Sequence, residues 1–155
     1  MFTLVRKCLL LFFGWGLMAC AQLSPPFSKV TNSGIEGQLL EQIANAMPTK
    51  GRPTAKGIPL LSKVYIYKKL LLAQLENQNG ALCNKINGQL VDSTFSDATG
   101  HYHLALKPGQ YSIVVGYENG YFIPYFSGID GVAYVQIEPQ KTTILNINVN
   151  QKASY

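Results

Sequence analysis

The segment from residue 90 to residue 117 constrains the fold most strongly, because its side chains alternate with a period of two. Apolar or small residues recur at every second position in three runs: Val91, Ser93 and Phe95; Tyr102, Leu104 and Leu106; and Tyr111, Ile113, Val115 and Tyr117. This period is typical of β-strands that present one face to a core. The Asp-Ala-Thr-Gly segment at 97–100 predicts a type I turn, and the Lys-Pro-Gly-Gln segment at 107–110 predicts another turn. Three antiparallel strands joined by tight turns are therefore expected.

Similar patterns predict strands on both sides of this segment. We expect a first strand at 34–40, a second at 64–67 that continues into an apolar stretch, and two more at 132–138 and 142–149, the last with Leu145, Ile147 and Val149 facing inward. Prolines and glycines make residues 44–60 a predicted loop, whereas residues 70–89 are compatible with a helical turn or an extended strand. About seven short strands predict an all-β fold, a single antiparallel β-sandwich. The absence of strand–helix alternation argues against a parallel α/β fold.

The first twenty residues have the layout of a cleavable signal peptide. Arg6 and Lys7 precede an apolar run at 9–17, which is shorter than the roughly 20 residues that a membrane-spanning helix needs. The Leu-Met-Ala-Cys ending at 17–20 resembles the lipobox of bacterial lipoproteins. That resemblance implies that the chain is cut before Cys20 and that this cysteine carries acyl chains, which together anchor a small domain stably. The alternative is an ordinary secretory peptide in which Cys20 has no such role.

The remaining chain has the size of one domain. We divide the sequence into a lipoprotein signal peptide at 1–19, a lipidated tether at 20–33, a β-domain at 34–150 and a tail at 151–155. The whole chain has 13 basic and 8 acidic residues, a mild excess that does not indicate nucleic-acid binding. After Cys8 and Cys20 are accounted for, Cys83 stands alone, so no intramolecular disulfide is expected and Cys83 is predicted to be a small buried hydrophobe.

Residues 96–113 (Ser-Asp-Ala-Thr-Gly-His-Tyr-His-Leu-Ala-Leu-Lys-Pro-Gly-Gln-Tyr-Ser-Ile) resemble the carboxypeptidase regulatory-like, or transthyretin-like, family. The shared features are an Asp-x-x-Gly turn, an aromatic residue two positions later, a Pro-Gly turn and a tyrosine. The resemblance extends over about 34–150, with the insert at 42–60 as its main departure. It implies a non-catalytic, seven-stranded prealbumin-like β-sandwich with an accessory role, as in lipid-anchored single domains of the Bacteroidetes, and it transfers no active site.

His101 and His103 are the only histidines, and they lie two residues apart on a predicted strand. Their side chains therefore point to the same face, a spacing that can chelate a metal if a third ligand such as Asp97 or Glu118 comes close. The alternative is that both simply occupy the solvent face of the strand. The sequence lacks the nucleophile, phosphate-loop and metalloprotease motifs, so we expect no enzymatic activity and no cofactor.

Two other segments are candidate binding surfaces. Between Glu41 and Glu76 the chain has no acidic residue, and the loop there carries Lys50, Arg52 and Lys56, which predicts either a basic patch or a solvated loop. The aromatic segment 117–127 contains a cluster of large rings among glycines, namely Tyr121, Phe122, Tyr125 and Phe126. Such a mixture can build a sugar- or peptide-binding surface, and it can equally fill a core.

These features predict a non-enzymatic accessory or interaction module, lipid-anchored in the cell envelope on the periplasmic or surface side. Its expected partners are the membrane, through Cys20, and an envelope protein or glycan. The first alternative is a glycan- or ligand-binding lipoprotein that uses the segment 117–127. The second is a metal-binding protein that uses His101 and His103.

Overall fold

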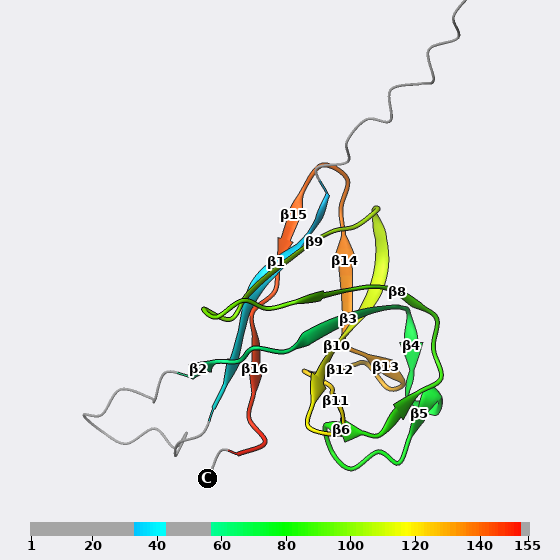
Figure 1. Ribbon diagram of the computed structural model, residues 1–155. Coiled ribbons are helices and arrows are strands. Elements are labelled where there is room, and N and C mark those ends of the chain that lie inside the picture. Colours follow the sequence, from blue (N-terminus) through cyan, green and yellow to red (C-terminus); the bar gives the residue numbers. More distant parts are fainter. Residues whose placement is uncertain (1–32, 43–56, 153–155) are drawn as a thin grey trace, which may run out of the picture.

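The computed structural model describes residues 33–42 and 57–152. These residues contain no α-helix, and apart from one 3₁₀ turn their regular structure consists of β-strands (Figure 1), which confirms the predicted all-β class. The elements are β1 (Gly34–Glu41), β2 (Ile58–Pro59), β3 (Lys63–Lys68), β4 (Leu70–Leu71), the 3₁₀ turn η1 (Leu72–Gln74), β5 (Leu75–Glu76), β6 (Leu82–Cys83), β7 (Lys85–Ile86), β8 (Leu90–Phe95), β9 (His101–Ala105), β10 (Gly109–Tyr117), β11 (Gly120–Phe122), β12 (Phe126–Ser127), β13 (Gly131–Val132), β14 (Tyr134–Ile137), β15 (Thr142–Ile144) and β16 (Ile147–Val149).

The number of strands differs from the prediction of about seven, because several predicted strands are divided. The expected strand at 132–138 is interrupted at Ala133, a buried residue with φ of 45°, which separates β13 from β14. The expected strand at 142–149 is divided into β15 and β16. In the ambiguous region 70–89, η1 forms the helical turn, whereas β4 does not extend β3, because it follows a bend at Lys69 and pairs with β13 in a separate small sheet.

One sheet is built around β1. β9 and β2 pair with β1 in antiparallel orientation, while β15 and β16 pair with it in parallel, one after the other along its length (Figure 1). The prediction of purely antiparallel pairing is therefore wrong at this position. Parallel neighbours need a long connection, and almost the whole domain lies between β1 and β15.

Gly37 explains how β1 accommodates two successive partners. The chain crosses from β15 to β16 at Leu145, and a Cβ atom on Gly37 would lie 1.8 Å from the Leu145 carbonyl oxygen. Leu145 donates its N–H to the Glu36 carbonyl oxygen, and the Asn146 side chain accepts the N–H of Gln38. A glycine is required at this crossing because no side chain fits between the two backbones.

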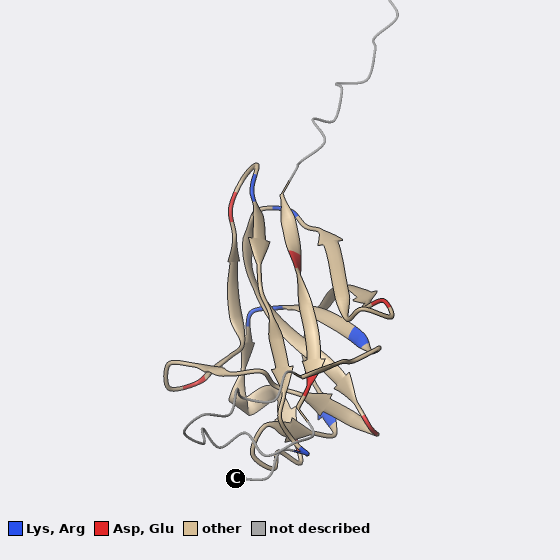
Figure 2. Cartoon of the chain, turned by 90° about the vertical axis from the view of Figure 1, so that its left-hand side faces the viewer, with Lys and Arg blue, Asp and Glu red and all other residues tan. Residues whose placement is uncertain are grey.

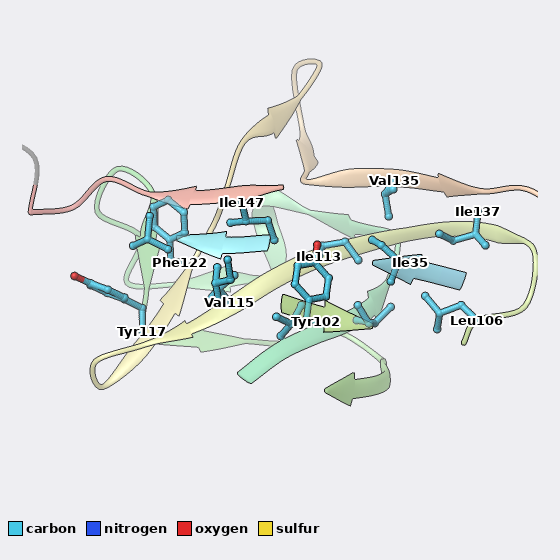
Figure 3. Close-up of a cluster of buried hydrophobic side chains, with 14 residues drawn as sticks. Ile35, Tyr102, Leu106, Ile113, Val115, Tyr117, Phe122, Val135, Ile137 and Ile147 are labelled. Atoms are coloured by element: carbon cyan, nitrogen blue, oxygen red, sulfur yellow. The ribbon is translucent and has the colours of Figure 1, made fainter. Parts of the chain in front are cut away.

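A second sheet has the order β6-β11-β10-β3-β8, and β14 also pairs with β10. Side chains from both sheets form one apolar cluster, the first core, and Figure 3 shows several of them converging from opposite sides. The contributions from the first sheet include Ile35, Leu39, Tyr102 and Ile147, and those from the second include Val64, Ile66, Ile113, Val115 and Phe122. This shared core confirms that Tyr102, Ile113 and Val115 face inward, as their alternation predicts.

The other face of β10 is also partly covered. Val114 and Ser112 are fully buried, and Val114 joins a second core with Tyr67, Leu70, Cys83 and Ile123. The small sheet β12-β13-β4 and the β5–β7 pair supply part of this cover. Cys83 is buried and unpaired, which confirms its predicted role as a small core residue. Alternation alone could not indicate this second layer, because it reports only one buried face.

Candidate ligand groove

An open groove lies on the outer face of the second sheet, toward one end of β3 and β10. We call it the aromatic groove; its volume is about 520 Å³, and its lining comes from the segment before β3, from β3 and β8, from Asn84 and from the β10–β11 hairpin. Lys63 pairs with Phe95 across β3 and β8, and Tyr65 follows Lys63 on the same face. Tyr121 pairs with Gly116 across β10 and β11. Strand register therefore gathers side chains that are distant in sequence.

Gly116 forms the floor of the aromatic groove. Because it carries no side chain, the Tyr65 ring can approach the backbone of β10, and a Cβ atom at Gly116 would lie 3.2 Å from the Tyr65 ring atom Cε2. The Ser62 hydroxyl donates a hydrogen bond to the Gly116 carbonyl oxygen, which fixes the segment before β3 beside this floor. The hollow thus results from one glycine in a row of larger residues.

The aromatic side chains of the groove support one another. The rings of Tyr65 and Tyr121 meet edge to face, with centroids 5.3 Å apart and an interplanar angle of 71°. Both rings also pack against the second core. Beneath them, burial raises the pKa of Tyr67, and the neighbouring Tyr121 raises it further. Phe95 differs from these residues because its ring is 66% exposed on the edge strand β8. The groove therefore combines a firmly packed aromatic wall with one exposed ring.

Lys63 places a positive charge between the aromatic rings. Its Nζ atom lies 5.1 Å from the centroid of the Tyr65 ring and 5.5 Å from that of the Phe95 ring. All eight acidic residues of the chain fall within the described ranges, and none of the ion pairs found there includes Lys63. Its ammonium group is therefore held by cation–π contacts rather than by a carboxylate.

Polar groups occupy the other end of the groove, at the turn between β10 and β11. Glu118 and Asn119 form this turn, and Glu118 has a φ of 50°. Asn84 contributes a side-chain amide from the neighbouring segment. A smaller hollow of about 130 Å³ shares these three residues and continues toward Leu82 and Cys83. Burial raises the pKa of the Cys83 thiol, so this thiol is a poor nucleophile.

The groove end of β10 is tied to the end of β1. The Tyr117 hydroxyl donates a hydrogen bond of 2.7 Å to Oε1 of Glu41, and the Lys152 ammonium lies 3.0 Å from the same oxygen. The Tyr117 hydroxyl and, to a smaller degree, Lys152 hold the pKa of Glu41 below its usual value. These contacts hold the hairpin, the first strand and the C-terminal segment together beside the groove.

The structure separates the four aromatic residues predicted as one surface. Tyr121 lines the groove, but Phe122 is 2% exposed and belongs to the first core. Tyr125 packs against the second core, and its hydroxyl donates to the Tyr134 carbonyl oxygen. Phe126 is partly exposed on β12. The segment 117–127 thus contains two strands, and the prediction missed Lys63, Tyr65 and Phe95, whose only sequence signal is their alternate spacing on two separate strands.

His101 and His103 lie exposed on β9, where His103 pairs with Glu36 and His101 with Gln38 across to β1. Asp97 is engaged by the turn, since its Oδ1 accepts hydrogen bonds from the Thr99 hydroxyl, the Thr99 N–H and the His101 N–H. These contacts, the Thr99 hydroxyl foremost, lower the pKa of Asp97. Within the described ranges, no group of three or more His, Cys, Asp or Glu side chains is arranged to hold a metal ion.

The remaining predicted residues lie outside the described part of the chain. These are Cys20 with its signal peptide and tether, and the loop residues Lys50, Arg52 and Lys56. In the part that is described, charged residues of both signs are interspersed over strands and turns (Figure 2). None of the described segments is a helix of the length and apolarity needed to cross a membrane.

Comparison with known proteins yields no relative. No family model matches the chain, and neither a curated protein nor a solved structure matches it significantly.

Proposed function

We propose that this chain is a lipid-anchored, non-enzymatic module of the bacterial cell envelope that binds its partner through the aromatic groove. The observation that supports binding is the groove itself, where rigidly packed rings, an ammonium group and amide side chains converge on one open hollow. Its described lining includes one carboxylate and no histidine, and its ammonium group, that of Lys63, lies over two aromatic rings, which suits a binding role.

We further propose that the domain is a β-sandwich of the carboxypeptidase regulatory-like, or transthyretin-like, kind. Two features support this assignment. Both large sheets contribute to the first core, and the Asp-x-x-Gly turn of the resemblance is formed by Asp97, with Gly100 at a φ of 78°. An accessory role in the envelope is what the resemblance implies.

The proposed anchor is supported by the sequence and by the position at which the domain begins. The lipobox-like segment ends at Cys20, the predicted tether ends at residue 33, and β1 starts at Gly34. The groove, by contrast, lies beside the far end of β1, where Glu41 bonds to Tyr117. This arrangement presents the groove away from the point of attachment.

The experiment that tests this function uses the full-length chain expressed in a bacterium. A photo-crosslinking amino acid replaces Phe95 in the groove or, as a control, Ile144, which is 70% exposed on β15 in the other sheet. We expect mass spectrometry to find acylated Cys20 and a recurrent envelope component crosslinked from position 95 but not from position 144. We also expect a Cys20→Ala variant to lose its attachment to the membrane. An unmodified Cys20, or identical crosslinks from both positions, would overturn the proposal.

A further inference from the structure

We infer that the aromatic groove binds an acidic carbohydrate, namely an oligosaccharide of uronic-acid units whose carboxylate meets Lys63. This inference rests on the proposed function, since it names the ligand class of the same groove. The sugar would lie across Phe95 and Tyr65, with its hydroxyl groups toward the polar turn at Glu118 and Asn119.

The backbone groups of the groove floor are already hydrogen-bonded within the sheet, so a ligand must be recognised by side chains. β3 lies between β8 and β10, and β10 lies between β3 and β11, so each of these floor strands is paired on both sides along the groove. Their N–H and C=O groups are thereby engaged, and an extended peptide cannot add to them as a further strand. A ligand of this floor must be recognised by ring faces, amides and charges.

A pyranose ring matches the chemistry that remains. Its faces carry C–H bonds that pack on the electron-rich face of an aromatic ring, while its edge carries hydroxyl groups. Phe95 offers an exposed ring at one side of the groove, and the amides of Asn84 and Asn119 with the Glu118 carboxylate offer donors and acceptors at the other. The volume of about 520 Å³ falls within the range of small-molecule sites and suits a short oligosaccharide.

Lys63 favours an acidic sugar over a neutral one. Its ammonium group lies over two rings, which orient it toward the groove without neutralising it, and the described acidic residues form no ion pair with it. A carboxylate of the ligand would supply the missing counter-charge. Glu118, at the opposite end of the groove, carries the only other charge among the described lining residues and can accept hydrogen bonds from sugar hydroxyls.

The test measures binding of fluorescently labelled hexasaccharides to the full-length protein in detergent micelles. The acidic probes are oligogalacturonate, oligomannuronate and hyaluronan fragments, and the methyl ester of the same oligogalacturonate supplies an uncharged counterpart. Lys63→Met keeps a flexible apolar chain over the rings but removes the charge. Lys69→Met is the matched control, because the Nζ atom of Lys69 also lies over a tyrosine ring, that of Tyr134, at 4.9 Å and outside the groove.

We expect at least one acidic probe to bind, and to bind more tightly than the uncharged methyl ester. Lys63→Met should weaken binding of the acid about fivefold and leave binding of the ester unchanged, whereas Lys69→Met should match the wild type. Phe95→Ala, at an exposed position that should not disturb folding, should weaken both ligands by about tenfold. Circular dichroism would confirm that each variant is folded.

Three results would overturn the inference: no binding of any acidic probe by the folded protein, equal binding of acid and ester, or wild-type affinity in both Lys63→Met and Phe95→Ala. The crosslinking experiment separates these failures from failure of the proposed function. If no sugar binds but an envelope component is still crosslinked at position 95, the binding module stands and only its ligand class is wrong.

Discussion

Removing the buried hydroxyl group of Tyr102 tests how strongly it stabilises the crossing from β15 to β16. The Tyr102 side chain is 1% exposed, and its hydroxyl donates a hydrogen bond of 2.6 Å to the Leu145 carbonyl oxygen. That carbonyl lies at the crossing from β15 to β16, directly over Gly37. In Tyr102→Phe the ring still fills the core, but the carbonyl oxygen loses this partner in a site that Gly37 and the ring shield from water.

The expected loss follows from the burial of the two groups. A buried acceptor left without a partner costs about 1–3 kcal/mol. Because Leu145 is only partly buried, the lower half of this range applies, and we expect Tyr102→Phe to reduce the free energy of unfolding by about 1–2 kcal/mol. A domain of this size should then lose about 4–8 °C in Tm, since each kcal/mol corresponds to about 4 °C.

The assay is urea unfolding followed by circular dichroism, with Tyr111→Phe as the matched control. The Tyr111 hydroxyl also donates to a backbone carbonyl, that of Lys107, but this bond lies in an exposed turn. The control should lose less than about 0.5 kcal/mol. Equal losses in Tyr102→Phe and Tyr111→Phe would refute the argument, because they would show that burial of the crossing adds nothing to the hydrogen bond.

Three further predictions concern other parts of the domain. Gly37→Ala should destabilise the fold by about 3 kcal/mol in urea unfolding, because the new methyl group collides with the Leu145 carbonyl; a loss below about 1 kcal/mol would show that the crossing moves aside. Glu41, whose pKa is lowered chiefly by the Tyr117 hydroxyl, stabilises the folded state when ionised, so this contribution is complete at neutral pH and is lost as the pH falls from its usual 4.5 through the lowered pKa. The Tm of Glu41→Gln should therefore depend less steeply on pH in this acid range, and an unchanged slope would contradict the assignment. The Cys83 thiol should react with a thiol reagent at least about a hundredfold more slowly in the folded protein than in urea, and equal rates would show that the strand opens readily.

The sequence predicts the inner faces of β9 and β10 well, for a physical reason, but not that of the edge strand β8, where Val91 and Phe95 are exposed. Ile113 and Val115 alternate with their neighbours, and the core selects apolar side chains at these positions. The same logic fails one residue away, because Val114 and Ser112 are also buried by a second layer built from short strands. A period of two cannot indicate burial on both faces.

The sequence predicts the groove less well than it predicts the fold. The clustered rings of 117–127 are compatible with a binding surface and with core filling, and both occur: adjacent residues of a strand point to opposite sides, so Phe122 enters the core while Tyr121 faces the groove. The other groove residues, Lys63, Tyr65 and Phe95, lie on strands whose pairing depends on register. A tight turn fixes the register of a hairpin, but no such turn joins β3 to β8, so the local sequence does not reveal which of their residues pair.

The length of β1 determines how far the aromatic groove lies from the point where the proposed tether joins the domain. The strand has eight residues, and at about 3.3 Å per residue it spans about 23 Å between Gly34, where the tether would end, and Glu41, which bonds to the groove strand through Tyr117. A tethered domain built in this way acts as a rigid spacer. If the proposed anchor is correct, it would hold the groove beyond the head-group layer, where a polymer too bulky or too highly charged to approach the bilayer could still be captured.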